Sequence, residues 1–155
     1  MLAATLVAPL ARSDEQSFEG IRYQVVPANS PSSARDTARR VLEHLARGEI
    51  DAAAQLSNGP ERRAQVLGDY LASVGEAEFK RVYAQYAQAP VSVELAIGER
   101  HLLIWDLAGS AAGQFFIRRD GAFLMDDVPG EERRRLQRLL RAYREGRFRP
   151  SGGTG

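Results

Sequence analysis

The chain has 155 residues, of which 44% are hydrophobic and 26% charged, the proportions of an ordinary soluble globular protein. This length favours a single domain with a core of its own. Cysteine is absent, which excludes disulfides, thiolate zinc ligands and cysteine nucleophiles. The net charge is only +1, yet from Glu131 onward eight arginines stand against three acids, an asymmetry that can mark an anionic partner.

Residues 1–13 have the pattern of a signal peptide or its remnant. An apolar run over residues 2–11 leads to Ala11-Arg12-Ser13, a small-x-small pattern that is compatible with signal-peptidase cleavage before Asp14. The basic segment that usually precedes such a run is missing, so we expect the true start to lie upstream. The alternative is an ordinary N-terminal arm. The run is too short to span a bilayer. The signal-peptide interpretation places the mature protein in the periplasm or outside the cell.

The next segment predicts one strand and one helix. Residues 18–26 alternate apolar and polar side chains, which predicts a strand that ends at Pro27. Ser33 and Asp36 then have the spacing of a capping box, which opens a helix with apolar positions at the helical period. Gly48 is expected to end this helix.

Three further helices are expected before Pro90. A short helix covers residues 50–56, a third begins at Pro60, and a fourth follows Gly75. The third places Val66 on its apolar face, and the last two carry three tyrosines on their core stripes: Tyr70, Tyr83 and Tyr86. Packing against the core is the simpler interpretation of these tyrosines, and a catalytic role is the alternative.

Past Pro90 the apolar period changes from helical to two, which predicts hairpin-linked strands over residues 91–97, 102–107, 114–119 and 122–125. A glycine-bounded loop, Gly109–Gly113, is expected before the third of these, and Asp120-Gly121 is a strong hairpin signal. The strand over residues 102–107 is apolar on both faces, as in a central strand that is covered on each side. Trp105, Phe116 and Tyr83 are expected among the most buried aromatic residues.

A basic helix is predicted from near Pro129. Its inward stripe is Leu136, Leu139, Leu140 and Tyr143, and arginines occupy its other faces. Residues 14–146 are therefore expected to form one α+β domain, followed by a flexible tail over residues 147–155.

The segment over residues 34–56, a helix followed by the turn Gly48-Glu49-Ile50-Asp51-Ala52 and a short helix, resembles the opening of NTF2-like (cystatin-like α+β cone) proteins. The resemblance covers about residues 33–126. It implies N-terminal helices packed on a curved antiparallel β-meander that encloses a pocket. The strand before the first helix and the basic helix after the sheet are additions to that pattern, and they would cap the cone or cover the outer face of the sheet.

The resemblance implies a pocket that serves catalysis in some relatives and plain binding in others, and fold alone does not choose between them. Enzymatic relatives of the ketosteroid-isomerase kind use a pocket carboxylate as the base, and the nearest candidate here is Asp106, with Tyr83 and Tyr70 as candidate hydrogen-bond donors. The interpretation that we favour places Asp106 near a strand end, in water or paired with Arg118 or Arg119.

Other polar residues favour structural roles. His101 in a turn and His44 on a charged helix side are expected to be solvated. Asp126 and Asp127, with Glu131 and Glu132, are expected to cap the last helix rather than to hold a metal. No metal or cofactor is expected.

The arginines of the last helix, with Arg134, Arg138 and Arg141 as the candidate partner-binding residues, form either a solvated basic face or a surface for an acidic partner. Nucleic acid is not an expected partner, because the chain as a whole is barely basic and shows no recognition motif.

The sequence thus favours an exported, non-catalytic binding or accessory protein that takes a small apolar ligand or a protein partner. A dimer is compatible with this sequence. The alternative is a small cofactor-independent lyase, isomerase or hydrolase.

We expect a precursor with its native upstream sequence to be exported and to begin at or near Asp14 after cleavage. N-terminal sequencing of the periplasmic product measures this. A cytoplasmic product that retains Met1 would contradict it.

Overall fold

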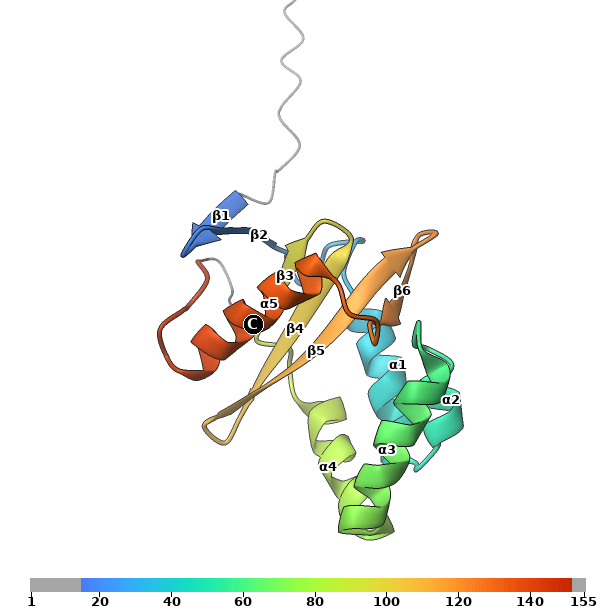
Figure 1. Cartoon of the computed structure of the whole chain (residues 1–155). Coiled ribbons are helices and arrows are strands. Elements are labelled where there is room, and N and C mark those ends of the chain that lie inside the picture. The colour runs from blue at the N-terminus through green and yellow to red at the C-terminus, as the bar shows by residue number, and fades with distance from the viewer. Residues whose placement is uncertain (1–14, 152–155) are drawn as a thin grey trace, which may run out of the picture.

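The computed structural model describes residues 15–151 as an α+β protein with a six-stranded antiparallel sheet in the order β1-β2-β3-β4-β5-β6. Four helices lie between the second and third strands, and a fifth follows the last strand (Figure 1). The strands are β1 (Glu15–Phe18), β2 (Ile21–Val25), β3 (Val93–Ile97), β4 (Arg100–Leu107), β5 (Ser110–Arg119) and β6 (Ala122–Met125). The helices are α1 (Arg35–Ala46), α2 (Ile50–Ala54), α3 (Pro60–Val74), α4 (Glu76–Gln88) and α5 (Glu131–Arg144).

The sheet is covered on both faces. Helix α5 lies on one face, and helices α1 to α4 lie on the side of the other (Figure 1). In β4, Leu102 and Ile104 belong to the α5 core, whereas Leu103 and Trp105 belong to the core of the four-helix side. The prediction of a central strand buried on both faces is therefore confirmed.

Helix α5 approaches the sheet closely because a glycine lies beneath it. The four residues of its predicted inward stripe are all buried. A Cβ added to Gly113 of β5 would lie 2.6 Å from Leu140 Cδ2, which is closer than real atoms pack. Gly113 thus makes room for the leucine stripe of α5.

Two tight turns were not recognised from the sequence. The strand predicted over residues 18–26 begins only at Ile21, and a further strand, Glu15–Phe18, precedes it, because Glu19 and Gly20 turn the chain with φ values of 48° and 80°. Ala108 and Gly109 make the same kind of turn with φ values of 50° and 79°, so the predicted loop over residues 109–113 is mostly the start of β5. Both are two-residue turns with positive φ at each position, as in the correctly predicted Asp120-Gly121 turn. Their first residues lack the usual Asn or Asp signal.

Packing continues beyond residue 146, where the domain was expected to end. Phe148 is 3% exposed, and its ring centroid lies 4.7 Å from that of Phe18 and 5.3 Å from that of Tyr23.

The predicted core residues differ in outcome. On α3, Val66 is exposed rather than on the core face, because α3 packs mainly through Leu67. Trp105 and Phe116 are buried as expected, whereas Tyr83 is only half-buried. The expected signal segment, residues 1–13, lies outside the described residues.

Within residues 15–151, none of the helices combines the length and hydrophobicity that a bilayer span requires.

Trp105 is the largest aromatic side chain of β4, and it is 5% exposed. Trp105→Ala is expected to lower the free energy of unfolding by about 3–5 kcal/mol, because it removes a large core side chain and leaves a cavity. Urea denaturation followed by far-UV circular dichroism measures this. The exposed Val66→Ala is the control and should change stability by less than about 0.5 kcal/mol. A near-neutral effect of Trp105→Ala would contradict the prediction.

Candidate functional site

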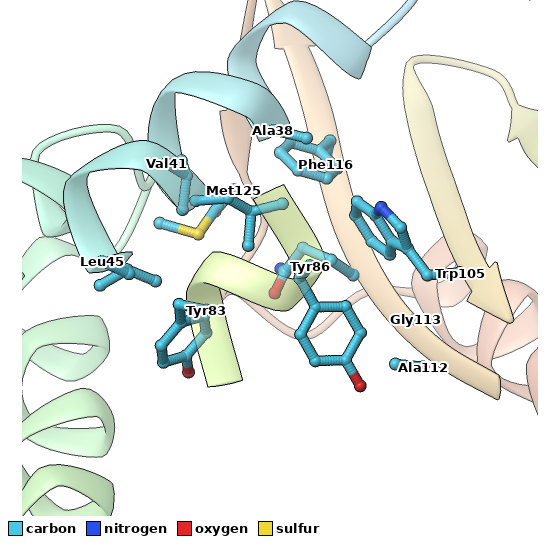
Figure 2. Close-up of a pocket in the computed structure, with 12 residues that line it drawn as sticks. Ala38, Val41, Leu45, Tyr83, Tyr86, Trp105, Ala112, Gly113, Phe116 and Met125 are labelled. Carbon is cyan, nitrogen blue, oxygen red and sulfur yellow. The ribbon is translucent and has the colours of Figure 1, made fainter. Parts of the chain in front are cut away.

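An apolar pocket lies between α1, α4 and the sheet. Its volume is about 210 Å³. Helix α1 contributes aliphatic side chains, α4 contributes Tyr83 and Tyr86, and the sheet contributes Trp105, Phe116 and Met125 (Figure 2). The half-buried members of the lining lie mainly on α4 and β5, which indicates that the pocket opens between these two elements.

The polar groups of the pocket are neutral. Among the side chains they are the two tyrosine hydroxyls, the amide of Gln114 and the indole N–H of Trp105. Figure 2 shows both hydroxyls on the side away from α1. Burial, reinforced by the neighbouring Tyr70, raises the pKa of Tyr83 to about 12, so its hydroxyl remains a hydrogen-bond donor at neutral pH. Within residues 15–151 neither tyrosine hydroxyl has a hydrogen-bond partner. Every fully buried side-chain N or O atom in this range does have one, so both hydroxyls must reach solvent.

The size of the pocket limits what it can hold. Pockets for drug-sized ligands usually measure ~300–1,000 Å³, whereas an apolar cavity of ~150 Å³ suffices for benzene. At about 210 Å³ this pocket fits one aromatic ring or one apolar side chain. Its chemistry therefore suits an apolar group that carries a hydrogen-bond acceptor.

The three candidate catalytic residues are not brought together. Asp106 is exposed, and its Oδ2 accepts a hydrogen bond of 2.5 Å from the Tyr143 hydroxyl, on the α5 face of the sheet. Burial and this hydrogen bond raise the pKa of Tyr143 to about 12. The partner of Asp106 is thus Tyr143 and not Arg118 or Arg119. Tyr83 lines the pocket on the opposite face.

Tyr70 lies behind Tyr83 rather than in the pocket lining. Its ring centroid is 6.1 Å from that of Tyr83 and 5.7 Å from that of the fully buried Phe79. It therefore positions the Tyr83 ring by packing.

The candidate partner-binding arginines of α5 differ in their surroundings. All three are exposed. Arg134 pairs with Glu131 at 2.7 Å, within the helix. Arg141 borders a groove between α5 and β5 of about 400 Å³, together with Arg144, and Phe115 and Leu140 contribute apolar side chains to it. Arg138 is not among the residues that line this groove.

A buried charge cluster surrounds Glu94 of β3, and no local sequence pattern indicated it. The Glu94 side chain is fully buried. Its carboxylate accepts hydrogen bonds from the Ser33 hydroxyl at 2.6 Å, the Ala34 amide at 2.8 Å and the Arg35 guanidinium at 2.8 Å. Burial lowers the pKa of Arg35, and the attraction of Glu94 opposes this shift.

The fourth partner of Glu94 is His101, at 2.6 Å from Nδ1. Because an ionised carboxylate only accepts hydrogen bonds, Nδ1 carries the proton. His101 lies in β4 and is 5% exposed, so the expectation that it is solvated in a turn is wrong. His44 is partly exposed and bonds to Glu49. His101 also borders a polar pocket of about 250 Å³ that includes Ser32 and Arg118.

The expected capping box forms only in part, and Glu94 completes it. Helix α1 begins at Arg35, and its N-cap residue is Ala34, which has no side-chain cap. Ser33 Oγ accepts a hydrogen bond of 3.1 Å from the Arg35 amide, whereas Asp36 pairs with Arg39. The Ala34 amide instead donates to a carboxylate 60 residues away in the sequence. An anion at a helix N-terminus is stabilised by the unpaired amides there. This cap is tertiary, and no local spacing signals it.

Asp126 and Asp127 join loops rather than cap α5. Asp126 is fully buried and bonds to Asn58 and Arg100, and Asp127 accepts two hydrogen bonds from Arg63. The N-cap position of α5 is Gly130, without a side-chain cap. Within the described part of the chain, no three His, Cys, Asp or Glu side chains are placed to share a metal ion.

Comparisons of the chain with protein-family models, with curated proteins and with solved structures find no match.

Glu94→Gln is expected to lower the free energy of unfolding by about 3–5 kcal/mol, because the amide keeps the shape but places a donor among four donors and leaves Arg35 without its counter-ion. Chemical denaturation at neutral pH measures the loss. The matched control is Glu99→Gln, an exposed glutamate in the β3–β4 turn, with an expected change below about 0.5 kcal/mol. Equal effects of the two substitutions would contradict the structural role of Glu94.

Proposed function

We propose that this protein is a non-catalytic binding module that takes an apolar group into the pocket between α1, α4 and β5. The observation that carries the proposal is the chemistry of the lining, which combines aliphatic and aromatic side chains with neutral hydrogen-bonding groups from Tyr83, Tyr86 and Gln114. Such a lining binds by burial of apolar surface and orients the ligand through a few polar groups.

An NTF2-like cone is part of the same proposal. Helices before the meander, packed on one face of an antiparallel sheet with a pocket between them, support it. The first hairpin and α5 are then additions to that core. Export is proposed as well, and it rests on the apolar run and the small-x-small pattern of residues 2–13.

Binding ranks above the alternative of a lyase, isomerase or hydrolase. Proton transfer needs a positioned base near the bound ligand. Among the described residues that line the apolar pocket there is no carboxylate and no imidazole. Asp106 lies on the other face of the sheet, and His101 borders a different, polar pocket.

Cyclohexanone, an apolar ring with one acceptor, is expected to bind with a Kd on the order of 0.1–1 mM. Trp105 is the only tryptophan and lines the pocket, so its fluorescence reports occupancy. Ala112→Leu, which fills the pocket from β5, should weaken binding about tenfold or more.

The matched control is Ala77→Leu, because Ala77 is exposed on α4 and does not line the pocket; it should bind as the parent does. The absence of a saturable fluorescence change in the folded parent protein would contradict the proposal, as would equal affinities of the two variants.

A further inference from the structure

Part of the β5 edge is unpaired. Strand β5 extends over ten residues, but β6 pairs only with Phe116 to Arg119. On its other side β5 pairs with β4 from Ser110 to Ile117, which includes the part that β6 leaves unpaired. The edge from Ala111 to Phe115 therefore has no neighbouring strand within the described residues, and an open edge of this length is a template for another strand.

Two backbone hydrogen bonds show in which direction the amides and carbonyls of β5 point. The Arg118 amide donates to Glu99 on the β4 side, whereas the Phe115 carbonyl accepts from the Asp126 amide on the β6 side. Because successive residues of a strand alternate, Ala111 and Gly113 direct their amides and carbonyls to the open edge. Arg144 Nε donates to the Ala111 carbonyl at 2.8 Å, and Gly113 has no backbone partner on that side among the described residues.

The two faces beside this edge differ in chemistry. The opening of the apolar pocket lies next to Ala112 and Gln114, on the face that α1 to α4 cover. On the α5 side, next to Gly113 and Phe115, lies the groove bordered by Arg141 and Arg144. A strand added at the edge would direct alternate side chains to these two faces, since side chains of a strand point to opposite sides in turn.

We propose that this edge binds an extended peptide segment in which apolar and acidic residues alternate. The peptide extends the sheet next to β5, places an apolar side chain in the pocket lined by Tyr83, Tyr86 and Trp105, and directs its carboxylates to Arg141 and Arg144. The inference rests on the proposed function, because it uses the same pocket. It adds the class of partner, which is a protein segment rather than a free small molecule.

The volume of the pocket and the charge of the groove favour this occupant. About 210 Å³ accommodates a single leucine- or phenylalanine-sized group. The arginines at the groove complement carboxylates and repel cationic peptides. Backbone hydrogen bonds along the edge supply affinity, and the two faces supply the alternation that defines specificity.

The test uses a labelled peptide Glu-Leu-Glu-Leu-Glu-Leu with blocked ends and follows fluorescence anisotropy. The expected Kd is on the order of 10–100 µM. The peptide Leu-Leu-Leu-Glu-Glu-Glu has the same composition without the alternation, and Lys-Leu-Lys-Leu-Lys-Leu reverses the charge. Both should bind at least tenfold more weakly. Equal binding of the alternating and the block peptides would overturn the proposal.

Backbone methylation separates strand addition from simple pocket filling. In an antiparallel addition the peptide amides that face β5 belong to residues with side chains on the α5 side, here the glutamates, and in a parallel addition they belong to the leucines. Methylation of the glutamate amides or of the leucine amides should therefore abolish binding in one peptide and spare it in the other. Equal affinities of the two methylated peptides would overturn the proposal.

Protein variants give an independent test. Ala111→Pro removes an amide that faces the open edge and leaves the β4 ladder intact, so it should abolish peptide binding while cyclohexanone still binds. Arg141→Gln should weaken peptide binding roughly threefold to tenfold, whereas Arg134→Gln, on the same helix but away from the groove, should change it less than about twofold.

The two proposals can fail separately. Cyclohexanone binding without binding of any of these peptides would leave the pocket proposal standing and overturn the peptide proposal. Self-association that Ala111→Pro abolishes, observed by sedimentation without peptide binding, would overturn it in favour of a second copy of this chain at the edge. Peptide binding without cyclohexanone binding would contradict the pocket proposal. If Ala112→Leu also leaves the peptide affinity unchanged, the placement of the apolar side chain in the pocket is wrong as well.

Discussion

The two-sided burial of β4 is the constraint on which the rest of the structure depends. Residues Leu102 to Trp105 are apolar on both faces, so neither face of the sheet can remain in water without a large loss of hydrophobic stabilisation. The chain meets this requirement with α1 to α4 on one face and α5 on the other. The amphipathic pattern of α5 follows from the same need, because its leucine stripe completes the second core and its arginines remain at the surface.

The Glu94 cluster fixes how the helical layer is placed on the sheet. One carboxylate of β3 accepts hydrogen bonds from three successive residues at the start of α1 and from His101 of β4. A buried carboxylate is stable only when several donors surround it, and this cluster satisfies that condition. The N-terminus of α1 is therefore held at one position against β3 and β4. The same helix provides one wall of the apolar pocket, so this anchor also shapes the candidate site.

The candidate site results from mismatched element lengths. Strand β6 is shorter than β5, and α4 stands beside the part of β5 that β6 leaves unpaired. The shortfall leaves both a pocket opening and a free strand edge at one place. An edge of this kind is normally covered or protected by charge, and here Arg144 covers a single carbonyl. The arginine-rich helix thus has a specific place in the fold, next to this edge.

The sequence by itself determined most of the elements, because amphipathic periodicity and turn residues are local signals. The helices, the last four strands and the inward stripe of α5 follow from these signals, and Asp120-Gly121 was recognised as a hairpin. The Glu19-Gly20 and Ala108-Gly109 turns were missed because their first residues adopt positive φ without being Asn or Asp. Only the tertiary structure decided the polar contacts, since Glu94 meets α1 across 60 residues and Asp106 meets Tyr143 across 37. The tertiary structure alone also decided the pocket and the open edge. Each depends on how distant elements pack together and on where a neighbouring strand ends, and no local sequence pattern encodes these.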